Sequence, residues 1–300
     1  MATVAAGLLA ACGSGPSQLG AAAIVGDTTV PLDQVQSQLR FVLEKEGPEA
    51  EAQLVQGRQL DDVARQIVTL EVRHELITAA ARREGLSVGE QQVTELVDSL
   101  GGAEAASAGT IFDAEGFRAR ARDQLLVVEL GRKYLPRLSV TVDFTTVGTR
   151  VAAMERVAEL AAAGPQGARE SIQADAARGT AAAVDQELSA LDAPEFASAP
   201  VFGVATDTVV GFPSDVQEGT WLVMVVTDVT TAPPVGGALS GVDPALLEAA
   251  GIRRLAPVAT DVGVRINPRY GIWDPLSVQA VPNENETAGF VAPLRRPPPV

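Results

Sequence analysis

Apolar residues recur every three or four positions through the first 136 residues, and this spacing predicts amphipathic helices. One short strand, residues 22–27 with a Gly-Asp turn at its end, is expected before them. The helices are predicted at about residues 31–46, 59–84, 88–100 and 114–135, with an irregular stretch at 101–110. The pattern therefore indicates a helical module that follows a single strand.

Local signals are expected to set three of the helix ends. Gly85 suits the left-handed position that closes a helix, so it should end the long helix. Ser87 and Glu90 have the spacing of a capping box and should begin the third helix. Asp113 should cap the fourth helix, which ends before Pro136.

Beyond residue 137 the pattern changes to the two-residue period of a strand. Apolar residues at 138, 140, 142 and 144 alternate with polar ones, which is typical of a half-buried strand. Alanine-rich helical sequence follows at about 150–163 and 167–177, and strand-like segments lie at 183–188, 208–212 and 221–229. This order indicates a small α+β domain.

The last part of the chain is predicted to begin with a Pro/Gly linker at 233–237 and a short helix that starts at Asp243-Pro244. A final strand pair is expected at about 261–267 and 276–281. Tyr270, Ile272 and Trp273 are large side chains in a chain with few aromatic residues, so they should be buried. We expect segment 258–282 to pack on the helices at 31–45 and 114–135.

Cys12, the only cysteine, follows a short apolar run that ends in Ala10-Ala11 and precedes Gly13-Ser14-Gly15. This arrangement is typical of a lipoprotein signal, in which the cysteine thiol receives a diacylglycerol. The alternative is an incidental or buried cysteine. Residues 1–12 contain no Lys or Arg, so the true start is expected upstream. The hypothesis places the protein on the outer face of the cytoplasmic membrane.

Composition narrows the possible chemistry. A net charge of −15 and a pI near 4.5 argue against nucleic acid as a partner. One cysteine and one histidine argue against common zinc clusters and Cys–His dyads, so no metal, cofactor or catalytic residue is expected. His74 lies on the apolar stripe of the long helix. It could act as a pH switch or as an acid–base catalyst, or it could be a half-buried histidine that is hydrogen-bonded to a neighbour. No second catalytic residue is spaced to act with it, so we favour the last interpretation.

Three segments resemble the SurA/PrsA-type extracytoplasmic chaperones in their actinobacterial lipoprotein form. They are the opening strand at 22–27 with the helix that follows it, the junction at 83–88 between the long helix and the next one, and the C-terminal strand segment Asn267–Pro275. The resemblance implies an α+β fold in which a mainly helical SurA-like module (21–137) follows a lipoprotein signal and flexible linker (1–20). It also implies an inserted parvulin-like domain (138–232), a returning C-terminal segment (233–282) and a disordered tail (283–300).

Two departures from active parvulins affect the expected function. The first strand of the inserted domain has no histidine, and residues 182–188 stand where the family has a Gly-Gly-x-Leu-Gly turn. The resemblance therefore implies a holdase that binds unfolded or nascent secreted and envelope polypeptides without prolyl isomerase activity. The alternatives are an active prolyl isomerase and a structural envelope lipoprotein with one dedicated partner.

Overall fold

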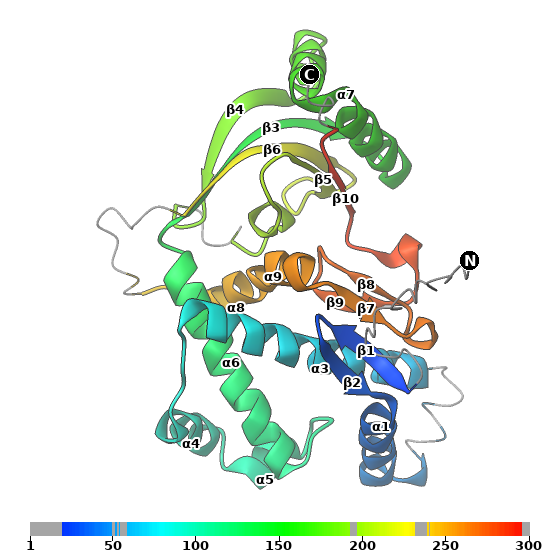
Figure 1. Cartoon of the computed structure of the whole chain (residues 1–300), viewed down its shortest axis with the longest axis vertical. Helices are drawn as coiled ribbons and strands as arrows, with labels where there is room; N and C mark the ends of the chain where they lie inside the picture. The colour runs from blue at the N-terminus through cyan, green and yellow to red at the C-terminus, as the bar shows by residue number, and fades with distance from the viewer. Residues whose placement is uncertain are drawn as a thin grey trace, which may run out of the picture.

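The computed structural model describes residues 20–49, 52, 54, 59–192, 197–231, 239 and 241–295. Cys12 and the 233–237 linker lie outside the described residues. Helices and strands are mixed along the chain, which is compatible with the expected α+β class. The helical module occupies the lower part of Figure 1, and a curved sheet covered by one long helix occupies the upper part.

Five helices of the helical module have bounds that lie wholly within the described residues, and the sequence pattern predicts four of them. They are α1 (Leu32–Glu46), α3 (Leu60–Glu84), α4 (Glu90–Ser99), α5 (Ala103–Ser107) and α6 (Ala114–Tyr134). The expectation of an irregular stretch at 101–110 is wrong at α5, a one-turn helix among small residues that carry no periodic apolar signal.

Two of the three helix-end predictions are confirmed. Gly85 adopts the left-handed conformation at the end of α3, and its N–H donates to the Ala81 carbonyl. The Asp113 carboxylate accepts a hydrogen bond from the Gly116 N–H at 2.7 Å. The capping box at Ser87 is wrong, because α4 begins two residues later than that box requires, and the Gln92 side chain accepts the Gly89 N–H instead.

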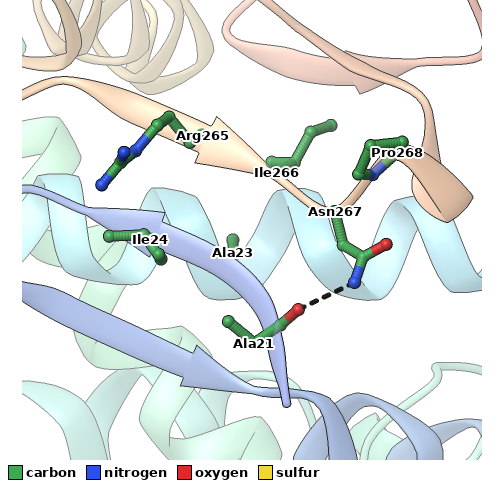
Figure 2. Close-up of a pocket in the computed structure, with 7 residues that line it drawn as sticks. All are labelled: Ala21, Ala23, Ile24, Arg265, Ile266, Asn267 and Pro268. Atoms are coloured by element: carbon green, nitrogen blue, oxygen red, sulfur yellow. Dashed lines mark hydrogen bonds between the residues drawn. The ribbon is translucent and has the colours of Figure 1, made fainter. Parts of the chain in front are cut away.

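The opening strand belongs to a three-stranded sheet. Strand β1 (Ala21–Val25) pairs antiparallel with β2 (Thr28–Pro31) on one side and with β7 (Val264–Ile266) on the other. Figure 2 shows β1 beside β7, where the Asn267 side-chain amide donates to the Ala21 carbonyl at 3.0 Å. A small hollow of about 90 Å³ lies beside this pairing and is lined by residues of β1 and by residues 265–268.

The predicted C-terminal strand pair is wrong in its partners. Residues 264–266 pair with β1, whereas β9 (Gln279–Val281) pairs with β8 (Ile272–Asp274). Between the second domain and β7 lie α8 (Pro244–Arg253), as expected, and α9 (Leu255–Val262), which was not predicted. The pairing of β1 with β7 joins residues about 240 positions apart in the chain, and local sequence patterns carry no information about such a distant partner.

The C-terminal segment lies on the helical module, but on a different helix from the two expected. Tyr270 and Val278 are buried in the core around α3, and Trp273 packs against that core half-buried. The Arg73 guanidinium of α3 donates to the Val278 carbonyl at 2.8 Å, and Thr69 accepts the Ala280 N–H. Helix α3 therefore holds this segment, rather than helices 31–45 and 114–135.

The second sheet contains five antiparallel strands in the order β10-β5-β6-β3-β4. Helix α7 covers one of its faces and kinks at Gly164-Pro165, between the two helical stretches predicted (Figure 1). The 3₁₀ turn η2 (Pro200–Gly203) packs on the opposite face. The strands are β3 (Leu138–Val147), β4 (Ala182–Ser189), β5 (Thr208–Pro213), β6 (Trp221–Thr231) and β10 (Phe290–Pro293); α7 spans Arg150–Ala177.

Two details of this sheet correct the sequence predictions. The tail expected to be disordered at 283–300 contributes β10, which pairs with β5, and its Phe290 ring lies 5.9 Å from the ring of Trp221. The half-buried pattern expected for the first strand also fails, because α7 covers its second face and buries Asp143 and Thr145, while Val140 and Val142 remain in the core of the first face. Arg169 of α7 pairs with Asp143, so the buried charge has a partner.

Candidate functional site

The face of the second sheet that α7 leaves uncovered contains an apolar hollow of about 380 Å³. Side chains on β6 alternate between the two faces of the sheet. Val223 and Val225 pack in the core beneath α7, whereas Met224 points to the other side and lines the hollow. The alternation of the strand therefore supplies both the core and the binding surface.

The hollow has a buried base and a more exposed border. Phe212 and Met224 form part of the base, and Phe202 of η2 forms part of a wall. Leu222 is half-buried, and Val216, in the loop between β5 and β6, is 77% exposed. A bulky apolar side chain that stands in water at such a border is available to a ligand.

The polar groups of the hollow are hydroxyls and carboxylates. The Ser189 and Ser214 hydroxyls accept N–H groups of the turns that follow them, so they shape the chain locally. Glu187, Asp192 and Asp215 are exposed, and within the described part of the chain their carboxylates form no ion pair. Among the described residues that line the hollow, none is Lys, Arg or His.

This arrangement suits the binding of an apolar side chain. Its volume lies in the range of about 300–1,000 Å³ that is usual for ligand pockets, and its lining is largely aliphatic and aromatic. The solvent-exposed carboxylates can contact polar or charged groups next to that side chain. Among the described residues, no group of three or more His, Cys, Asp or Glu is placed to hold a metal ion.

The residues singled out from sequence lie elsewhere. Cys12 is outside the described residues. His74 is on α3 in the helical module, and its Nδ1 lies 2.9 Å from an oxygen of Asp123 on α6. The expectation of a half-buried histidine hydrogen-bonded to a neighbour is confirmed. Arg120 also contacts Asp123, at 3.1 Å, so the carboxylate contacts both the imidazole and a guanidinium.

The Asp123 hydrogen bond raises the pKa of His74 above its ordinary 6.5, against the opposing effects of burial and of the Arg120 charge. Because the folded-state pKa is the higher one, the stabilisation is fully present below pH 6.5 and is lost as the pH rises through the folded-state pKa. Wild type should therefore exceed His74→Gln in unfolding free energy by more at about pH 5.5 than at about pH 8.5. Urea titrations at both pH values measure this, and an equal difference would contradict it.

The residues of the hollow are not among those predicted from the sequence. The segments 208–212 and 221–229 are predicted only as strands of the second domain. The available signal was the run from Trp221 to Val226, which is apolar on both faces of the strand although α7 can cover only one. Which part of the second face stays open depends on η2 and the β5–β6 loop, and no local pattern reports that.

No protein-family model matches the sequence, and no curated protein matches it. Two solved structures of PrsA foldases are similar to the chain at 11% identity. The protein from Lactococcus lactis covers 83% of this chain and 95% of its own, with a TM-score of 0.27. The protein from Streptococcus pneumoniae covers 81% and 94%, with a TM-score of 0.24. At these values the likeness carries no argument about function.

Proposed function

We propose that this chain is a holdase that binds unfolded or partly folded segments of secreted and envelope proteins. The observation that carries the proposal is the apolar hollow beside η2, on the face of the second sheet opposite α7. An unfolded segment exposes apolar side chains that a folded protein buries, and such a side chain gains free energy by entering the hollow. The net charge of −15 keeps the complex soluble.

The proposal also holds that the chain does not catalyse prolyl isomerisation. It is supported by the side chains around the hollow, which are apolar, hydroxyl-bearing or acidic, and by the place of His74 in the helical module. Isomerisation crosses a barrier of about 18–20 kcal/mol, so a catalyst is readily detected against the slow uncatalysed rate. A protease-coupled assay on proline peptides should give that background rate, and acceleration well above it would contradict this part.

We further propose that the protein is anchored through a lipid on Cys12 and faces the extracytoplasmic side. Among the described helices, none has the length and hydropathy to cross a bilayer. In cells that express the full upstream reading frame, Cys12→Ala should move the protein from the membrane fraction to the soluble fraction. A membrane-bound variant, or an unmodified cysteine by mass spectrometry, would contradict the anchor.

The holdase proposal predicts a specific effect of Val216→Asp. Val216 is 77% exposed, so the change should leave the fold intact while placing a charge at the border of the hollow. We expect the Kd for a permanently unfolded, reduced and carboxymethylated protein to rise by about tenfold, which corresponds to the loss of one well-buried apolar contact. Fluorescence anisotropy with a labelled client measures it.

Val151→Asp is the matched control, because Val151 is also an exposed valine but lies on α7, away from the hollow. This variant should bind the client like wild type. If both variants bind like wild type, the hollow does not hold the client. If only Val151→Asp is impaired, the client binds at α7 and the proposed site is wrong.

A further inference from the structure

Charges in the second domain are divided between the two faces of its sheet. Residues 138–231 contain four arginines and no lysine, and every one of the four belongs to α7 or to the residue that ends it. All four are engaged there: Arg150 with the carbonyls of Glu284 and Thr287, Arg156 and Arg178 with Asp175, and Arg169 with Asp143 and Asp185. The free face therefore has no basic side chain of its own.

The hollow on that free face is bordered only by acidic charges. Asp192 follows β4 and Asp215 lies in the β5–β6 loop, so two separate segments bring carboxylates to one hollow, whereas Glu187 on β4 points to the other face of the sheet from its neighbour Leu188. Two arginines of the α8–α9 segment bond to the backbone of η2 and of the residues before it, and neither lines the hollow. The Arg253 guanidinium donates to the Ser198 carbonyl at 2.9 Å and is buried, and Arg254 donates to the carbonyl of Phe202.

We propose that the hollow selects polypeptide segments in which lysine or arginine flanks the apolar side chain that it binds. Such a segment can place its apolar side chain on Phe212 and Met224 while its cations meet the exposed carboxylates. A segment with flanking acids would bring like charges together. This selectivity rests on the proposed function, because it specifies the client class of the same hollow.

Three labelled peptides with the same Leu-Phe-Leu core test the selectivity, one flanked by arginines, one by serines and one by glutamates. Kd is measured by anisotropy with the full chain, at about 10 mM and about 1 M salt, where the Debye length falls from about 30 to about 3 Å. The arginine peptide should bind about tenfold more tightly than the serine peptide at low salt, as two exposed ion pairs allow, and the glutamate peptide more weakly. High salt should remove most of the difference.

The variant Asp192→Asn/Asp215→Asn should bind all three peptides alike. Its control, Glu44→Gln/Asp98→Asn, removes the same charge from exposed residues of the helical module and should keep the preference. If the peptides bind wild type equally and Val216→Ser, which removes the apolar contact without adding a charge, weakens them all, the hollow binds clients and the charge selectivity is wrong. If Val216→Ser weakens none of them, or none binds, the proposed function itself fails and the selectivity with it.

Discussion

Gly251→Ala should destabilise the protein by about 3 kcal/mol, because α8 crosses α6 through a pair of glycines that leave no space for a side chain. A Cβ at position 251 would lie 2.0 Å from the Val127 carbonyl oxygen, and one at Gly131 would lie 1.9 Å from that of Leu247. Both obstacles are backbone, so a rotamer change cannot relieve them and the helices must separate. The gain in helix propensity, about 1 kcal/mol, is too small to compensate.

Urea denaturation followed by circular dichroism measures this effect. The control is Gly148→Ala, since a Cβ there meets nothing within 4 Å and the residue has no positive φ. That variant should stay within about 0.5 kcal/mol of wild type. A Gly251→Ala protein as stable as the Gly148→Ala protein would show that α6 and α8 do not cross at this distance.

Asp274→Ala should have the second large effect, a loss of about 3–5 kcal/mol. Asp274 is 1% exposed, and its carboxylate accepts hydrogen bonds from the Leu276 N–H, the Ser277 hydroxyl and the Ala288 N–H. Burial lowers the pKa of Arg253 to about 10, and the negative charge of Asp274 acts against this lowering. Alanine would leave the buried Leu276 N–H and the half-buried Ser277 and Ala288 donors without this acceptor.

Thermal and urea unfolding of Asp274→Ala test this, with Asp274→Asn as an intermediate variant that keeps one acceptor oxygen. Asp261→Ala is the control, because Asp261 forms an ion pair with Arg83 in which both side chains are exposed. It should lose much less stability than Asp274→Ala. Equal losses in the two variants would mean that the buried carboxylate does not hold the turn before β9.

Elements with a clear period were predictable from the sequence. The apolar stripe of α3 ends at Gly85, and Gly164-Pro165 separates the two helical stretches of α7. Helix α9 was not predicted, because Leu255–Val262 is apolar on several sides and contains Pro257. The proline lies in the first turn, where its missing N–H needs no partner, so the helix forms regardless.

Long-range pairing and the open face of the sheet were not predictable. Strand β7 has only three residues, and what fixes it is the edge of β1, far away in the chain. The same holds for β10, whose Phe290 is placed by Trp221 and by the edge of β5. The hollow depends on such packing too, since Leu222 and Met224 would be ordinary core residues if another element covered them.

The methionine methyl groups report directly on whether unfolded segments bind in the hollow. The chain has three methionines, at positions 1, 154 and 224. Met224 lines the hollow, whereas Met154 is 48% exposed on α7. In a methyl-labelled sample titrated with an unfolded client, the Met224 resonance should shift or broaden while that of Met154 stays unchanged. A client that binds and perturbs Met154 but not Met224 would contradict the account.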